Sequence, residues 1–277
     1  MTNVIQYRDA SDTTRGPSPS VWGTCPVLEI MAQVGQGSGG YYFWEDFDAH
    51  GLVTAPTALA ALGGGLPFTG FGSSGSKQEV DDASGGSSGF LLEETTHEEG
   101  ANFTTENHPY VLSNVAGSLW FEARVKSSTI TTNEMSFFVG LADTTAFTAV
   151  MPLTAPGAVG DLNCIGFHKP EANTTAFDFS YKANGVTLEE VNSDIGTLAV
   201  DTYVKLGFLM HESDYKVRCF VNGAEQASTT TVSDALGTDT PSDGGLAPAG
   251  AIKNAGGTAE GLTIDWIRCA QLLPAGT

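Results

Sequence analysis

The alternation of apolar and polar residues is the strongest pattern along this chain. In residues 118–126, every second side chain from Leu119 onward is apolar, and the residues between are Trp or charged. Residues 203–210 repeat the pattern from Val204 onward. This two-residue period is typical of strands with one face in a core. We predict strands at 41–47, 118–126, 135–142, 162–168, 176–182, 203–210, 215–221 and 262–270.

Turn signals separate these segments. A short polar turn, His211–Asp214, lies between two predicted strands, and Asn222-Gly223 follows the second with residues that tolerate positive φ. Glycine is abundant, with 34 of 277 residues against a usual share of about 7%. Strands about ten residues apart predict an all-β fold, an antiparallel two-sheet jelly-roll sandwich.

The two ends of the chain differ in character. Residues 1–40 lack periodicity, and we predict an extended N-terminal arm and linker there, followed by the sandwich domain at 41–277. We assign no strand to residues 55–90, and we interpret Glu93–Glu106 as an acidic loop. A few arm residues are expected to bind a partner protein: Val4, Ile5, Tyr7, Arg8, Val21 and Trp22.

The charge of the chain is strongly negative. Thirty-two Asp and Glu residues against 12 Lys and Arg residues give a net charge of −20. Binding of nucleic acid requires basic residues that displace counterions from phosphates, so neither nucleic acid nor an anionic membrane is an expected partner. The N-terminus does not resemble a signal peptide, and no apolar run reaches about 18 residues. We therefore expect synthesis and assembly in a cytosol.

The cysteines lack metal-binding or redox spacing. Cys25, Cys164, Cys219 and Cys269 contain no CxxC motif, and three of them lie in apolar strands. Buried free thiols are the expected state, and a Cys219–Cys269 bridge stays open.

Motifs for catalysis are weak. A glycosidase requires two carboxyl groups about 5–10 Å apart, and Glu45–Asp48 and Glu189–Asn192 do not provide that pattern. No zinc spacing links the histidines, which are His50, His97, His108, His168 and His211. We expect no catalytic residues, no metal and no cofactor.

The tryptophans are candidates for sugar contacts. Trp44 and Trp266 lie in the first and last predicted strands, where a core position is expected. Trp120 points away from Leu119 and Phe121, so we predict a surface aromatic that contacts a glycan or a partner.

Several segments together resemble a known family. They occur in one order over about residues 90–271: Leu119–Lys126, Phe138–Ala142, Cys164–Phe167, Tyr203–Phe208, Val217–Gly223 and Leu262–Gln271. The chain resembles tailed-phage virion structural proteins with concanavalin A-like or laminin-G-like jelly rolls, which occur among head and decoration proteins. No catalytic residues carry over from that family.

The resemblance implies a non-enzymatic capsid decoration, or cement, protein on the outer surface of a virion. Its expected partners are the major capsid protein and neighbouring copies in a dimer or trimer. A protein that binds only the assembled lattice stabilises it by mass action. Two alternatives stay open, which are a carbohydrate-binding module of a fibre or host-contact structure, and a glycan hydrolase or lyase that uses Asp46.

Overall fold

The structure is a computed structural model of the chain. It describes residues 15–27, 30, 39–47, 68–73, 75–83, 87–105, 109–112, 117–143, 162–172, 175–183, 190–214, 216–226 and 245–273. Within these ranges lie one short helix, α1 (Pro19–Trp22), and the strands β1 (Gly40–Glu45), β2 (Phe68–Gly72), β3 (Lys77–Ala83), β4 (Ser87–Glu94), β5 (Gly100–Thr105), β6 (Leu119–Ser127), β7 (Met135–Ala142), β8 (Cys164–Lys169), β9 (Ala176–Lys182), β10 (Glu190–Thr197), β11 (Val204–Met210), β12 (Val217–Val221), β13 (Ala224–Glu225), β14 (Ala247–Asn254) and β15 (Glu260–Leu272).

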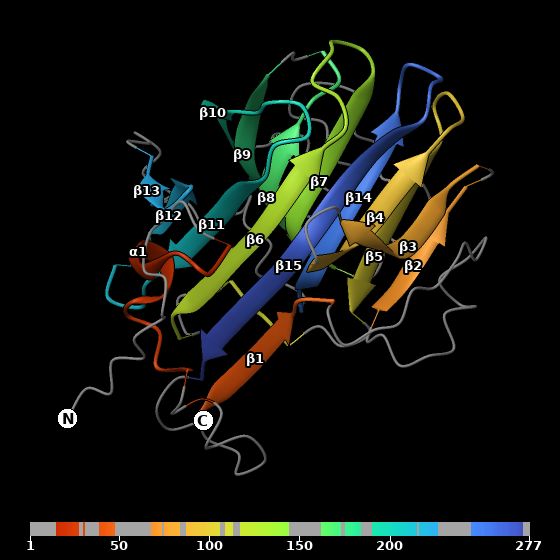
Figure 1. Cartoon of the computed structure of the whole chain (residues 1–277). Coiled ribbons are helices and arrows are strands. Elements are labelled where there is room, and N and C mark those ends of the chain that lie inside the picture. The colour runs from red at the N-terminus through yellow and green to blue at the C-terminus, as the bar shows by residue number, and fades with distance from the viewer. Residues whose placement is uncertain are drawn as a thin grey trace.

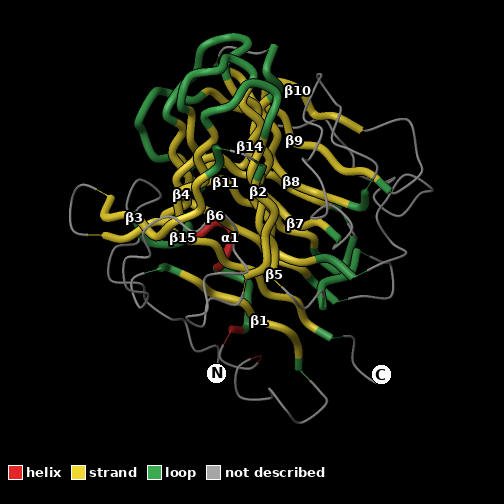
Figure 2. The backbone as a smooth tube through the Cα atoms, turned by 90° about the vertical axis from the view of Figure 1, so that its right-hand side faces the viewer, coloured by secondary structure: helices red, strands yellow, loops and turns green. Residues whose placement is uncertain are grey.

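The strands form two antiparallel sheets that face each other. Sheet A has the order β13-β12-β11-β6-β15-β4-β3, and β1 pairs with the C-terminal half of β15. Sheet B has the order β10-β9-β8-β7-β14-β5-β2. Figure 1 shows sheet A in front of sheet B, and Figure 2 shows the two as separate layers. The predicted all-β jelly-roll sandwich is confirmed.

The core lies between the sheets, where the alternation of the sequence placed it. Phe121 of β6 lies opposite Phe208 of β11, and their rings stack with centroids 4.8 Å apart. Sheet B contributes Phe137 and Val139 of β7 to the same buried cluster. All four cysteines are free thiols, so no Cys219–Cys269 bridge forms.

The turn prediction at Asn222-Gly223 is confirmed. Both residues have positive φ, 50° and 76°, and they connect β12 to β13. Asn and Gly are the residues that adopt this backbone conformation at least cost.

Several strands were missed by the sequence interpretation. The predicted acidic loop contains β5, in which Ala101 and Phe103 face the core. Strand β14 contains Pro248 and Gly250, both unfavourable in strands, yet it pairs with β7 on one side and β5 on the other. Pairing on both sides therefore outweighs the weak local propensity.

The N-terminal segment covers part of the outer face of sheet A. Figure 1 shows α1 lying over β6 and β11. Val21 and Trp22, predicted to bind a partner, are buried instead in a cluster with the chain's own Trp120 and Leu209. The other predicted contacts, Val4, Ile5, Tyr7 and Arg8, lie outside the described residues.

Three predictions about tryptophans are wrong. Trp120 is 1% exposed rather than a surface residue, because the N-terminal segment covers it and Thr24 accepts its Nε1–H at 3.2 Å. Trp44, expected in the core, is 38% exposed on the edge strand β1. Trp266, also expected in the core, is 1% exposed but lies on the outer face of sheet A, where its Nε1–H donates to the carbonyl of Arg15 at 2.6 Å.

No helix among the described residues is long and apolar enough to cross a membrane. The division into an arm at 1–40 and a domain at 41–277 stays a prediction.

Candidate ligand site on the outer face of sheet B

A row of side chains crosses the outer face of sheet B. Because alternate residues of a strand point to opposite sides, the neighbours of the core residues Phe137 and Val139 face outward. The strand register aligns one such residue from each of five strands. From β5 to β9 these are Asn102, Ala251, Phe138, His168 and Asp178.

Beside this row two glycines lie opposite each other on neighbouring strands. Gly140 of β7 lies opposite Gly166 of β8, and the next position on β14 is Ala249. A Cβ added at Gly140 would lie 2.2 Å from the carbonyl oxygen of Ile165. Glycine is therefore required for the close approach of the two strands. The ring of Phe138 lies over Gly166, where an added Cβ would be 2.9 Å from Cζ of Phe138.

His168 is a buried polar side chain without a partner. Both of its ring nitrogens are shielded from solvent, and neither has a hydrogen-bond partner. The hydroxyl groups of Ser136 and Ser180 are in the same state. Both serines face outward, diagonally next to His168 in the strand register. A buried polar group left unpaired costs about 1–3 kcal/mol, so each such group in a native structure calls for an explanation.

The electrostatics of the row follow from burial. Burial lowers the pKa of His168 to about 3, and the charge of neighbouring Lys169 acts in the same direction. The imidazole is therefore neutral at neutral pH, with one nitrogen as donor and the other as acceptor.

Asp178, directly opposite His168, is fixed in position by the backbone. Burial raises the pKa of its carboxyl group. Its Oδ1 accepts the N–H of Asp194 at 2.9 Å, where the register of β9 and β10 shifts at a bulge. Bulges of this kind often direct a side chain next to a functional site.

The row can act chemically in a limited number of ways. It offers a neutral imidazole, two hydroxyl groups and a carboxyl group beside the ring of Phe138, which suits a ligand with many hydroxyl groups. Glycosidases use two carboxyl groups, whereas the described residues of this row provide one, that of Asp178. No group of three metal-ligating side chains occurs among the described residues.

The site residues predicted from sequence do not lie on this face. Val21, Trp22 and Trp120 are on sheet A, and Asp46 follows β1 of that same sheet. The sequence contained a signal in β9, where Asp178 and Ser180 alternate with Phe177 and Phe179. That signal shows which residues share a face, but it does not indicate that their polar atoms lack partners.

No family model matches the chain, and no curated protein matches it. Solved structures do resemble it. A protein of unknown function from Shewanella oneidensis MR-1 is 10% identical with a TM-score of 0.55, over 96% of this chain and 99% of that chain. An endo-1,3-β-glucanase from Streptomyces sioyaensis is 11% identical with a TM-score of 0.51, over 84% and 96%. The Crh5 transglycosylase is 13% identical with a TM-score of 0.50, over 84% and 85%.

These likenesses confirm the jelly-roll sandwich and correct one expectation. The prediction that the chain is not an enzyme is contradicted, because proteins that share its fold include a glucanase and a transglycosylase. None of the solved structures described here is named as a capsid protein. Attachment to a major capsid protein, self-association and location on a virion stay predictions that the comparisons do not support.

Proposed function

We propose that this chain binds a glycan on the outer face of sheet B, with His168 at the centre of the site. The observation that carries the proposal is the pair of buried ring nitrogens of His168 that lack partners, beside the equally unpaired hydroxyl groups of Ser136 and Ser180. A sugar ring carries several hydroxyl groups, and each can donate to one of these atoms and accept from another.

The energetics favour a ligand that satisfies these groups. The folded chain already bears the cost of burying them, about 1–3 kcal/mol for each group. A ligand that pairs with them removes this cost, whereas an analogue without the hydroxyl groups leaves them unpaired and is rejected. Phe138, next to His168 in the row, is 0% exposed and forms the apolar side of the site together with Ala249 and Ala251.

The fold is consistent with this proposal. The glucanase that shares the fold is named for a 1,3-β-glucan, which makes that polymer a suitable first ligand. A neutral imidazole facing a carboxyl group is also a combination that can transfer protons. The binding experiment should therefore record cleavage of the glycan as well.

The test is calorimetric titration of the whole chain with soluble 1,3-β-glucan and with a panel of other neutral polysaccharides. We expect binding by the wild type, and we expect His168→Leu and Ser180→Ala to weaken it about tenfold or more. Ser213→Ala is the matched control, because Ser213 lies in an exposed turn where it bonds to His211. The same mixtures are analysed for released oligosaccharides.

Two results would contradict the proposal. The first is wild-type affinity in both His168→Leu and Ser180→Ala. The second is the absence of binding to every glycan of the panel by a folded wild-type chain.

A further inference from the structure

Cations and aromatic rings alternate across the outer face of sheet A. The guanidinium carbon of Arg268 lies 3.4 Å from the ring centroid of Trp44 and 4.6 Å from that of Trp266. On the next strand, Arg124 lies opposite Trp266 and 3.9 Å from the ring centroid of Tyr203. These residues and Lys126, whose Nζ lies 5.4 Å from the same centroid, form the cation–aromatic strip: Trp44, Arg268, Trp266, Arg124, Tyr203 and Lys126.

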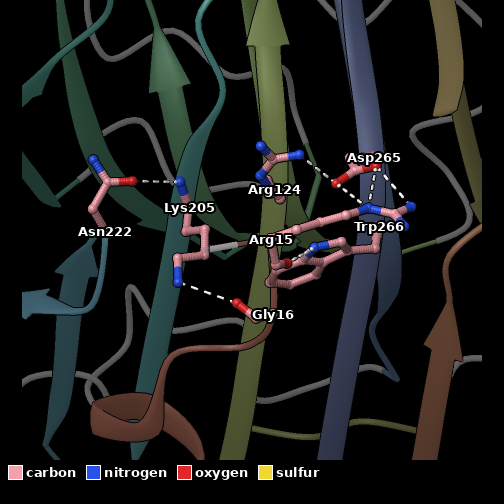
Figure 3. A network of polar contacts seen from close by, with 7 residues as sticks. All are labelled: Arg15, Gly16, Arg124, Lys205, Asn222, Asp265 and Trp266. Carbon is pink, nitrogen blue, oxygen red and sulfur yellow. Dashed lines mark hydrogen bonds and ion pairs between the residues drawn. The ribbon is translucent and has the colours of Figure 1, made fainter. Parts of the chain in front are cut away.

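Among the residues that the structure describes, the carboxylates next to the strip are hidden from solvent. The side chain of Asp265 is 0% exposed and binds Nη2 of Arg15 at 3.0 Å and Nη1 of Arg124 at 2.5 Å (Figure 3). The side chains of Arg15 and Arg124 are 42% and 20% exposed. A ligand that approaches these three residues therefore meets the two guanidinium groups before the carboxylate.

The second carboxylate, Glu122, is 0% exposed and is turned toward the N-terminal segment. Its Oε2 accepts the backbone N–H of Ser18 and the Nε1–H of Trp22, each at 2.9 Å. Further carboxylates that face outward, Glu79 and Glu93, lie on β3 and β4, and Glu93 is paired with Lys77.

Basic residues are concentrated on this face although the chain is acidic. Of the 12 Lys and Arg residues, five lie in the strip or directly beside it. Arg15, Arg124 and Lys126 reach solvent, whereas Lys205 and Arg268 are 2% and 7% exposed. Their positions are fixed by the fold, as Figure 3 shows for Lys205, whose Nζ donates to the carbonyl of Gly16 at 3.1 Å. Side chains that are already ordered lose little entropy when a ligand binds.

We propose that the cation–aromatic strip binds an acidic oligosaccharide, with the carboxylates on Arg124 and Lys126 and the sugar rings on Trp44 and Tyr203. Trp266 and Arg268, which are 1% and 7% exposed, support the strip from beneath. The guanidinium group forms planar, paired hydrogen bonds with a carboxylate. Trp44, 38% exposed at one end of the strip, supplies an aromatic face for a sugar ring. This site is separate from the His168 site, because it lies on the other sheet.

The overall charge decides which anion fits. At physiological salt, charges are screened beyond about 8 Å, so a short ligand responds mainly to the cations that reach solvent here, which are Arg15, Arg124 and Lys126. Double-stranded nucleic acid carries a charge about every 1.7 Å and is repelled by a chain with a net charge of −20. An oligosaccharide with one carboxylate per ring carries fewer charges and also has apolar faces.

The test compares trigalacturonic acid with its methyl ester, which has the same rings without the charges. We expect the wild type to bind the acid, to bind the ester at least about tenfold more weakly, and to lose affinity for the acid between about 50 mM and 500 mM NaCl. Arg124→Gln and Lys126→Gln each weaken binding of the acid about tenfold. Lys126→Gln leaves the ion pairs of Asp265 intact, so it tests the strip even if Arg124→Gln fails to fold.

Arg218→Gln is the matched control. Arg218 lies on β12 of the same sheet, away from the strip, where it pairs with Asp214 and Glu225, and its loss should leave binding unchanged. Lys126→Gln should also leave binding of neutral glycans at the His168 site unchanged. Equal affinity for acid and ester, wild-type affinity in Lys126→Gln, or tighter binding of a single-stranded oligonucleotide would each overturn the proposal.

Discussion

Replacement of His168 by leucine tests whether this buried imidazole lacks partners. Leucine has a similar size and no polar atoms, so the substitution removes two buried nitrogens that lack hydrogen bonds. Removal of an unsatisfied buried polar group recovers about 1–3 kcal/mol. We expect His168→Leu to raise the free energy of unfolding at pH 7 by this amount. Unpaired polar groups that lower stability by this amount are typical of functional sites, where activity requires them.

The pH dependence of the free energy of unfolding gives a second, independent test of the same side chain. In the folded chain the pKa of His168 is lowered from 6.5 to about 3, whereas in the unfolded chain it returns to its usual value. Between these two values the unfolded state binds a proton that the folded state does not, so this residue lowers stability as the pH falls from about 6.5 to about 3. At pH 4.5, two units below 6.5, the loss is about 3 kcal/mol.

The assay is urea unfolding followed by tryptophan fluorescence, at pH 7 and at pH 4.5, for the wild type and His168→Leu. The advantage of the variant should grow by about 3 kcal/mol at the lower pH, because leucine does not titrate. His97→Leu is the control, since the side chain of His97 is 63% exposed. Its loss should leave the free energy of unfolding close to that of the wild type at both pH values. The reasoning is refuted if the variant is less stable than the wild type at pH 7, or if the difference between the two is the same at both pH values.

Three further predictions concern the rest of the molecule. Trp22→Ala removes a ring that is 5% exposed between the N-terminal segment and sheet A, so the segment should detach, and trypsin should cleave after Arg15 faster than in the wild type. Gly140→Ala places a Cβ 2.2 Å from a backbone oxygen of β8, and the melting temperature should fall by several degrees in calorimetry. Burial raises the pKa of Cys25 to about 12, so its thiol should not react with Ellman's reagent at pH 8 until the chain is unfolded in urea.

The sequence by itself determined the class of fold and most of its strands. The alternation in β6 and β11 settled which residues face the core, because successive side chains of a strand must point to opposite sides. The turn at Asn222-Gly223 was also fixed locally, since few residues adopt positive φ at low cost. These features depend on residues close together in the chain.

Only the tertiary structure decided what covers the outer faces. Trp120 and Trp44 both point away from the core. Trp120 is buried because Trp22 and Thr24, about a hundred residues earlier in the chain, pack over it, whereas Trp44 is exposed. The row around His168 likewise depends on the register of five strands that are distant in sequence. Alternation specifies which side chains share a face, but contacts between distant segments determine whether that face is covered and whether its polar atoms find partners.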